Sequence, residues 1–405
     1  MKAVVWHGVG DIRLDEVEEP RIEQPTDAIV RITASAICGT DLHMVRGTLA
    51  PLEPGTVLGH EAVGVIEELG PDVRNFAVGD RVIIPSTIAC GSCVYCRAGE
   101  YSQCDVANPH GNRAGTAYFG GPAISGPFQG LQAEKARVPF AHVGLVKIPD
   151  SVTDLQAITL CDIFPTAYFG AENAEITAGD TVAVFGCGPV GLLTIVSAKL
   201  LGAGRVLAVD RDPTRLDKAR ELGAEVINFD EEDPVEAIVR LTGGIGVDRA
   251  VDAVGVDAVR PHQGKAADAL KSREQEFEHE LEEMAPDARH EGDHFVSGDA
   301  PSLALEWAVD ALCKSGTLSI IGVYPETAKW FPIGKAMNKN LTLKMGNATH
   351  RKYIPHLLEL VETGVVDPAE VMTNVEPLTS ALDAYEHFDA REPGWIKVEL
   401  ETYSH

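Results

Sequence analysis

The sequence TVAVFGCGPVGLLTIVSAKLLGAGRVLAVD, residues 181–210, is the most informative stretch of this chain. It begins with an apolar run of strand length, continues with an apolar segment of helix length at 189–203, and ends with a second apolar run at 205–210. A buried strand, a helix and another buried strand in this order build neighbouring parallel strands of one sheet. The stretch therefore predicts part of an α/β fold.

The residues that follow continue the same alternation. A second helix is predicted at 213–224, and apolar runs at 247–255 and 317–324 supply later strands. Residues 256–300, between those two runs, are polar, and we expect their charges to be solvated. An amphipathic helix inserted there is predicted from four apolar residues at roughly helical spacing: Leu270, Phe277, Leu281 and Met284.

The turn between the first strand and its helix carries a G-x-G-x-x-G motif, formed by Gly186, Cys187, Gly188, Pro189, Val190 and Gly191. Such glycines let the backbone approach a pyrophosphate at the positive end of a helix. A tight turn that binds nothing is the alternative. Because the motif lies between a strand and a helix, and an acidic residue follows at about the expected distance, we favour a dinucleotide site.

The acidic residue is Asp210, at the end of the second strand. Its carboxylate would accept hydrogen bonds from the adenosine ribose and repel a 2′-phosphate, which favours NAD over NADP. Arg211 follows directly and could offset part of that repulsion. NADP therefore remains an alternative.

A second motif lies in CGSCVYCRAGEYSQC, residues 90–104, which contains Cys90, Cys93, Cys96 and Cys104. Four thiolates this close in sequence can surround one zinc ion tetrahedrally. Buried or disulfide-bonded cysteines are the alternative. Since the intervening residues are mostly small or polar and offer no hydrophobic core, we predict a structural zinc lobe.

Length and composition limit the remaining possibilities. A chain of 405 residues with 45% hydrophobic content is expected to form two globular domains. The formal net charge of −27 would repel phosphate backbones and anionic lipid, so nucleic acid and membranes are unexpected partners. The charge is consistent with solubility or with adaptation to high salt. The first residues lack a secretion signal, so we expect a cytoplasmic protein.

The N-terminal part is predicted to be mostly β, with short strands at 28–37, 61–69 and 80–86 separated by turn residues. The C-terminal residues, after a helix at 353–364, again read as short strands. We therefore expect the first domain to be discontinuous, with both chain ends contributing to it.

Two short segments of the N-terminal part, CGTDLH at 38–43 and GHE at 59–61, each follow a strand-like run and carry a possible zinc ligand. Alone, a buried cysteine or a hydrogen-bonded histidine would explain either. Together with the zinc lobe, LGHEAVGVIEELG, LCDIFPTAYFGA and FGCGPVG, they resemble the medium-chain, zinc-dependent alcohol dehydrogenase family over nearly the whole chain. ICGTDLHMVRG and CDIFPTAYFGA are most similar to its glutathione-independent formaldehyde dehydrogenases.

The resemblance implies a GroES-like, mostly-β catalytic domain at 1–162 and 347–405, and a Rossmann domain with a doubly wound parallel sheet at 163–346. It implies a catalytic zinc held by Cys38, His60 and Asp162, with a fourth position open for substrate. Many family members have a cysteine ligand at the position of Asp162, so the neighbouring Cys161 is the alternative third ligand. Glu61 would lie beside the metal.

The same resemblance implies a proton path through Thr40 and His43. Cofactor contacts are expected, beyond the glycine motif and Asp210, from Thr166, Arg215, Val323 and Lys397. Apolar substrate contacts are guessed at Phe119, Phe128, Ile163 and Trp330, for which core packing is the alternative.

We therefore expect two zinc ions per chain, NAD as cofactor, and hydride transfer between NAD and an alcohol or aldehyde hydrate. A formaldehyde dismutase, a polyol dehydrogenase and a non-catalytic nucleotide-binding relative are the alternatives. The resemblance favours a homo-oligomer, with a tetramer as the expected form. The sequence leaves the substrate open.

Overall fold

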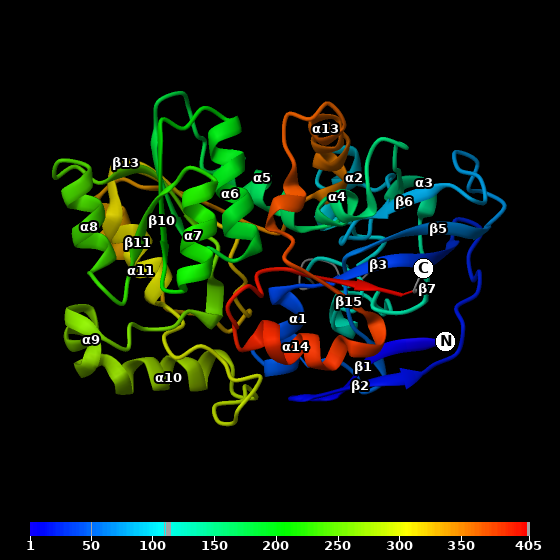
Figure 1. The fold of residues 1–405 in the computed structure, drawn as a ribbon, viewed down its shortest axis with the longest axis horizontal. Coiled ribbons are helices and arrows are strands. Elements are labelled where there is room, and N and C mark those ends of the chain that lie inside the picture. The colour runs from blue at the N-terminus through cyan, green and yellow to red at the C-terminus, as the bar shows by residue number, and fades with distance from the viewer. Residues whose placement is uncertain (50, 109, 111–114, 403–405) are drawn as a thin grey trace. The chain divides into compact units, whose positions relative to one another are not determined.

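The computed structural model describes residues 1–49, 51–108, 110 and 115–402 (Figure 1). The chain forms two compact units. Unit 1 contains Met1–Val45, Ala50–Pro165 and Asn347–His405, and unit 2 contains Arg46–Leu49 and Thr166–Gly346. Both chain ends thus belong to one unit. The expected boundary at residue 162 differs slightly from the observed one at Pro165, and the short segment Arg46–Leu49 was not expected in the second unit.

Unit 2 is built on a six-stranded sheet in which every strand pair is parallel. The strands are β9 (Thr181–Phe185), β10 (Arg205–Asp210), β11 (Glu225–Asn228), β12 (Val247–Asp252), β13 (Leu312–Ile320) and β14 (Thr342–Met345). Their order is β11-β10-β9-β12-β13-β14, which is the Rossmann order 3-2-1-4-5-6. The expected doubly wound sheet is present.

Helices connect these strands. They are α5 (Ile163–Asn173), which starts in unit 1, α6 (Pro189–Leu200), α7 (Pro213–Glu221), α8 (Pro234–Leu241), α11 (Leu303–Ala311) and α12 (Ile333–Asn338). Asp212 and Asp233 cap α7 and α8, because each carboxylate accepts the N–H group three residues later and a proline follows it. These caps fix where the two helices begin.

The inserted segment forms α9 (Gly264–Leu270) and α10 (Glu274–Met284). Phe277, Leu281 and Met284 are buried on one side of α10, as the helical spacing predicted. Leu270 belongs to α9 and not to the same helix, because a 3-10 turn at Lys271–Arg273 separates the two. The inserted amphipathic helix is therefore confirmed with a later start.

Unit 1 is mostly β. Its main sheet has the order β15-β16-β3-β5-β6-β8, with β7 also paired to β3, and a smaller sheet has the order β2-β1-β4. The strands are β1 (Lys2–Gly8), β2 (Asp11–Glu16), β3 (Ala28–Ile37), β4 (Thr56–Val57), β5 (Ala62–Leu69), β6 (Arg81–Ile84), β7 (Lys135–Val138), β8 (Val146–Lys147), β15 (Asn374–Pro377) and β16 (Val398–Glu401). Because β16 pairs with β3, the C-terminal strand lies in one sheet with strands from the N-terminal part of the chain.

The helices of unit 1 are short, apart from α13. They are α1 (Gly39–Arg46), α2 (Val94–Arg97), α3 (Ala141–Gly144), α4 (Asp154–Thr159), α13 (His350–Glu362) and α14 (Ala381–Asp389). Thr153 caps α4 in a reciprocal capping box with Gln156. In the described residues, 3-10 turns occur at Tyr101–Gln103, Ala123–Ser125, Gly255–Asp257, Lys271–Arg273, Pro368–Val371 and Leu378–Ser380.

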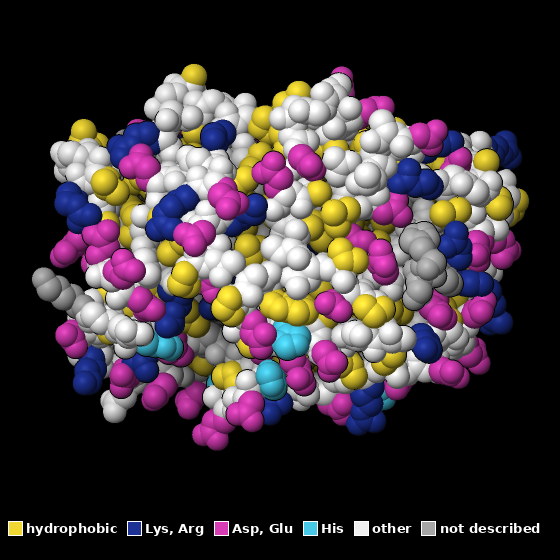
Figure 2. All heavy atoms as spheres, in the orientation of Figure 1, with side chains coloured by type: hydrophobic (Ala, Val, Ile, Leu, Met, Phe, Trp, Pro, Cys, Tyr) yellow, Lys and Arg dark blue, Asp and Glu magenta, His cyan; other side chains and the backbone are white. Residues whose placement is uncertain are grey.

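The surface reflects the acidic composition. Figure 2 shows Asp and Glu side chains spread over the visible face with Lys and Arg among them, so that face carries no dominant basic patch. None of the helices in the described ranges is long and apolar enough to cross a membrane. All eight cysteines lie in those ranges and are free thiols.

Candidate active site

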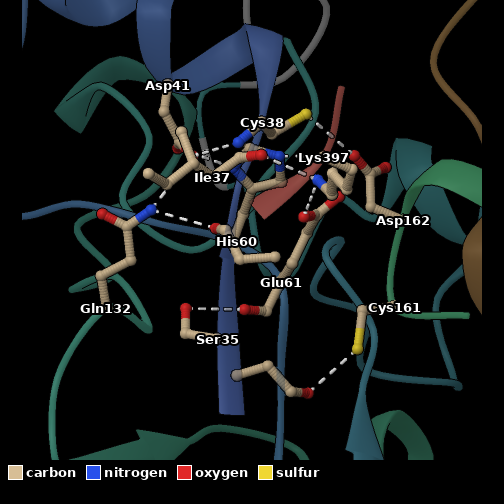
Figure 3. A network of polar contacts seen from close by, with 12 residues as sticks. Ser35, Ile37, Cys38, Asp41, His60, Glu61, Gln132, Cys161, Asp162 and Lys397 are labelled. Atoms are coloured by element: carbon tan, nitrogen blue, oxygen red, sulfur yellow. Dashed lines mark hydrogen bonds and ion pairs between the residues drawn. The ribbon is translucent and has the colours of Figure 1, made fainter. Parts of the chain in front are cut away.

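Segments distant in sequence meet in unit 1 at the end of β3. Cys38 directly follows β3, His60 and Glu61 directly precede β5, and Asp162 directly precedes α5. Their possible ligand atoms all lie within 4.8 Å of one another, and all four residues are buried. In this cluster the Cys38 Sγ lies 3.6 Å, and the His60 Nε2 3.4 Å, from the Asp162 Oδ2 (Figure 3).

Asp41 fixes the orientation of the His60 ring. Its Nδ1 lies 3.1 Å from the Asp41 Oδ1, which leaves Nε2 facing the cluster. The other oxygen of Asp41 accepts the Cys38 N–H at 2.9 Å and a Gln132 side-chain N–H at 3.2 Å. Asp41 therefore holds two candidate ligands at once, a role that the sequence reading missed although Asp41 lies within the quoted CGTDLH.

Glu61 forms a buried ion pair with Lys397, whose Nζ also donates to the Ile37 carbonyl at 2.9 Å (Figure 3). The other Glu61 oxygen, Oε1, has no hydrogen-bond partner among the described residues. Lys397 was expected to contact a pyrophosphate. In this structure its ammonium group is turned to Glu61, so the pyrophosphate contact stays a prediction.

The cluster fits a zinc ion. A thiol, an imidazole and a carboxylate are the donor types of zinc sites, and Oε1 of Glu61 is a further buried oxygen beside them. Burial raises the pKa of Cys38, so its thiolate needs a compensating cation. Burial opposes ionisation of Asp162 as well, but hydrogen bonds from His350 and His60 hold its pKa well below the usual range.

Cys161 does not join this cluster. Its Sγ lies 3.0 Å from the carbonyl oxygen of Ala62, to which the thiol donates, and burial raises the pKa of that thiol well above its usual value. Figure 3 shows its sulfur directed away from Cys38 and His60. The geometry therefore favours Asp162 over Cys161 as the third candidate ligand.

His350, on the far side of Asp162, was not identified from the sequence. Its Nε2 lies 2.6 Å from the Asp162 Oδ1, and its Nδ1 lies 3.1 Å from the Thr87 hydroxyl. No local sequence pattern predicts the contact between His350 and Asp162, because the two residues are 188 positions apart along the chain.

The two residues of the expected proton path lie on α1, three positions apart. Thr40 is partly exposed and His43 is buried. Residues at this spacing share one side of a helix. Of the guessed substrate contacts in unit 1, Phe119 and Ile163 are fully buried core residues.

The four cysteines of the lobe also come together. The sulfur atoms of Cys90, Cys93, Cys96 and Cys104 lie within 4.8 Å of one another. Burial opposes ionisation of Cys90, but hydrogen bonds from Ser92 and from the Cys93 N–H lower the pKa of its thiol to about 6. The Cys93 Sγ caps α2 by accepting the Cys96 N–H. This arrangement fits one tetrahedral zinc ion.

In unit 2, the glycine motif forms a close turn between β9 and α6. A Cβ atom on Gly191 would lie 1.9 Å from the Gly186 carbonyl oxygen, and Gly186 has φ of +88°. A Cβ on Gly188 would have only one neighbour within 4 Å, the Arg215 Nη1 at 3.9 Å. The conformation and packing of the turn therefore require glycine at 186 and 191. At Gly188 the space beside the backbone is unfilled, and Arg215 lies at its edge.

Asp210 connects this turn to the end of β10. Its Oδ2 accepts the Cys187 N–H at 2.7 Å, and its Oδ1 accepts the N–H groups of Arg211 and Asp212 at 2.7 and 3.0 Å. The Arg211 side chain is directed to Asp230, with 2.9 Å between Nη2 and Oδ2. The guanidinium is thus already paired.

The remaining expected cofactor contacts also lie in unit 2. Thr166 is half-buried on α5, and Val323 follows β13. The Val323 carbonyl accepts the Val256 N–H at 2.8 Å, which joins the end of β13 to the inserted segment. Trp330 is partly exposed and packs beside His279 of α10, so it contacts the insertion.

Two family models match the chain. Residues 24–150 match the alcohol dehydrogenase GroES-like domain, and residues 189–268 match the zinc-binding dehydrogenase model. Apart from Arg46–Leu49, the first match lies in unit 1, and the second lies in unit 2.

Full-length relatives agree with these matches. The uncharacterized zinc-type alcohol dehydrogenase-like protein AdhB of Bacillus subtilis (strain 168) is 38% identical over 404 residues, covering 99% of this chain and 100% of the relative. A glutathione-independent formaldehyde dehydrogenase of Pseudomonas aeruginosa (strain LESB58) is 34% identical over 410 residues, covering 97% of this chain and 96% of the relative. The solved structure of alcohol dehydrogenase TADH from Thermus sp. ATN1 has a TM-score of 0.80 and 35% identity, with 100% of both chains covered. The chain belongs to the medium-chain, zinc-dependent alcohol dehydrogenase family.

Proposed function

We propose that this enzyme transfers a hydride between NAD and an alcohol or aldehyde hydrate at a zinc ion held by Cys38, His60 and Asp162. The observation that carries the proposal is the buried cluster of thiol, imidazole and carboxylate. These donors would balance the two charges of the ion and leave a position open for the substrate oxygen. Glu61, whose Oε1 has no hydrogen-bond partner in the part of the chain that the structure describes, would be a transient additional ligand.

When bound, zinc acts as a Lewis acid and NAD accepts a hydride. The chain itself must orient the substrate and remove its proton. Thr40, one helical turn before His43 on α1, supplies a hydroxyl for the first transfer. His43 would pass the proton on toward solvent.

The preference for NAD is supported by two side chains in unit 2. Asp210 lies at the end of β10, where the motif expects a ribose contact, and its carboxylate accepts the Cys187 N–H of the glycine turn. Arg211, the residue that would favour NADP, is paired with Asp230. The structural zinc, the second ion per chain, is supported by the four gathered cysteines.

Formaldehyde is a candidate substrate, because a relative at 34% identity is named a glutathione-independent formaldehyde dehydrogenase. An aldehyde dismutase is the alternative reaction on the same substrate. In that reaction one formaldehyde hydrate is oxidised to formate while the NADH formed reduces another formaldehyde to methanol. No net NADH would accumulate.

The test is an assay of NADH absorbance with NAD and a panel of short alcohols, polyols and formaldehyde without glutathione. NADH formation supports a dehydrogenase, and formaldehyde loss with equal methanol and formate supports the dismutase. The variant Asp162→Ala should lose turnover and one zinc per chain, while Cys161→Ala should keep both. Full activity and zinc content in Asp162→Ala would contradict the proposed site.

We also propose that the enzyme is a homo-oligomer, with a tetramer favoured by family resemblance. Strand β14 is an edge strand of the unit 2 sheet. Met345 on β14 is 61% exposed, and Ile333 and Met337 on the preceding α12 are 69% and 72% exposed. Exposed apolar side chains beside a sheet edge suit contact with a second copy. Light scattering of wild type and Met345→Glu tests this, because the charge should dissociate the assembly.

A further inference from the structure

Hydrogen bonds, together with the peptide bond between Thr349 and His350, connect the four-cysteine lobe to Asp162 within unit 1. The loop between Cys96 and Cys104 contacts the residues directly before α13: the Ser102 hydroxyl donates to the Asn347 carbonyl at 3.0 Å. Thr349 contacts the same loop twice. Its hydroxyl donates to the Gly99 carbonyl at 3.0 Å and accepts the Tyr101 N–H at 2.9 Å.

The next residue is His350, the first residue of α13. It is 3% exposed, and its imidazole lies between the Thr87 hydroxyl and the Asp162 carboxylate. When the Thr87 hydroxyl donates to Nδ1, the proton of the neutral ring resides on Nε2 and is donated to the Asp162 Oδ1. This leaves the Asp162 Oδ2 toward His60 and Cys38, at 3.4 and 3.6 Å.

We propose that His350 is a positioning residue for the catalytic metal, and that the four-cysteine lobe sets the position of His350 through Thr349. The lobe would thereby act on the catalytic site as well as on the stability of its own loop. This inference rests on the proposed function, in which Asp162 is a zinc ligand.

The physical reason is the cost of an unfixed carboxylate in a buried site. Without the N–H of His350, the Asp162 Oδ1 loses its contact at 2.6 Å, and the carboxylate is held less firmly. Partners that orient a metal ligand typically contribute about 10–100-fold to metal affinity. Thr349 does not contact Asp162 itself, so removing its hydroxyl should lower zinc affinity by a smaller factor.

The experiment measures zinc retention and not activity. Wild type, Asp162→Ala, His350→Leu and His350→Gln are equilibrated with a series of zinc buffers, and bound zinc per chain is measured. His350→Leu should bind the catalytic zinc roughly 10–100-fold more weakly while the lobe keeps its ion. His350→Gln should retain much of the affinity, because its amide N–H can replace the imidazole donor.

Thr349→Val tests the connection to the lobe. It removes both contacts with Gly99 and Tyr101, and it should weaken catalytic zinc binding several-fold. Thr363→Val is the matched control, because the Thr363 hydroxyl, at the other end of α13, donates to the Glu359 carbonyl of its own helix. It should leave both zinc affinities unchanged.

Three results would overturn the inference. Unchanged catalytic zinc affinity in His350→Leu would show that His350 does not position the metal site. Equal losses of zinc affinity in His350→Gln and His350→Leu would show that the donated hydrogen bond is not what matters. Wild-type affinity in Thr349→Val would remove the link to the lobe. A failure of the proposed function is distinguishable, because in that case Asp162→Ala would bind as much zinc as wild type.

Discussion

Asp230 holds the guanidinium of Arg211 in an ion pair, with 2.9 Å between Oδ2 and Nη2. Arg211 directly follows Asp210, the residue expected at the adenosine ribose, so this pair bears on the choice between NAD and NADP. The Asp230 carboxylate pairs with the cation that directly follows Asp210 in the sequence. The ion pair would therefore reduce the attraction of Arg211 for a 2′-phosphate, in line with the proposed preference for NAD.

Asp230→Asn should raise the use of NADP relative to NAD. The change frees Arg211 to pair with a 2′-phosphate, and a charge-assisted hydrogen bond contributes roughly 1.5–3 kcal/mol, which corresponds to about tenfold or more in the ratio of kcat/KM values. The measurement is kcat/KM for both cofactors. Asp217→Asn, which breaks the exposed ion pair with Arg220 on α7, is the control. An unchanged ratio in Asp230→Asn would mean that Arg211 does not read the ribose position.

Two glycines of the same turn should respond differently to alanine. Gly191→Ala places a Cβ 1.9 Å from a backbone oxygen, so the turn must move, and we expect a lower melting temperature. Gly188→Ala finds space, with its nearest neighbour at 3.9 Å, so the fold should persist. Its Cβ would occupy the surface that a pyrophosphate approaches, and NADH affinity should fall at least tenfold by fluorescence titration. Normal NADH binding by Gly188→Ala would place the cofactor elsewhere.

These glycines also illustrate what the sequence was able to predict. The β9–α6–β10 unit and the cysteine lobe are local: each is encoded by consecutive residues with a fixed spacing, so pattern and position were both correct. All four sulfur atoms of the lobe come from one short segment, residues 90–104.

The surroundings of the metal cluster could not be predicted in the same way. His350 and Asp162 are 188 positions apart, and Lys397 and Glu61 are 336 positions apart. Such contacts arise only when β16 pairs with β3 and α13 packs against the lobe, and no periodicity in the sequence records them. Lys397 was therefore noticed as a basic residue, but the direction of its side chain was not.

The lobe should contribute to stability through its metal. Cys93→Ser removes one of four thiolates and should release the lobe's zinc, because three ligands leave the shell incomplete. We expect a lower melting temperature and a loss of about one zinc per chain. Cys313→Ser is the control, since Cys313 is a half-buried cysteine outside both clusters. If both variants have the melting temperature of the wild type, the lobe is not a stabilising metal site.

Glu399 should make the stability of the enzyme depend on pH. It lies on β16 opposite Ala36, it is 4% exposed, and burial, with the charges of Glu401 and Asp154, raises its pKa from 4.5 to about 7. The folded state thus binds the proton more tightly than the unfolded state. The stabilisation from the neutral acid is fully present below pH 4.5 and is lost as the pH rises to about 7.

Glu399→Gln removes this dependence, because the amide stays neutral. Relative to wild type, the variant should unfold at the same urea concentration near pH 4.5 and at a higher one at pH 8, where the difference should approach about 3 kcal/mol at roughly 1.4 kcal/mol per pKa unit. The measurement is urea unfolding of both proteins at the two pH values. Glu370→Gln, at an exposed position of the same unit, should show no such difference. An equal gap between wild type and Glu399→Gln at both pH values would mean that Glu399 does not titrate in this range.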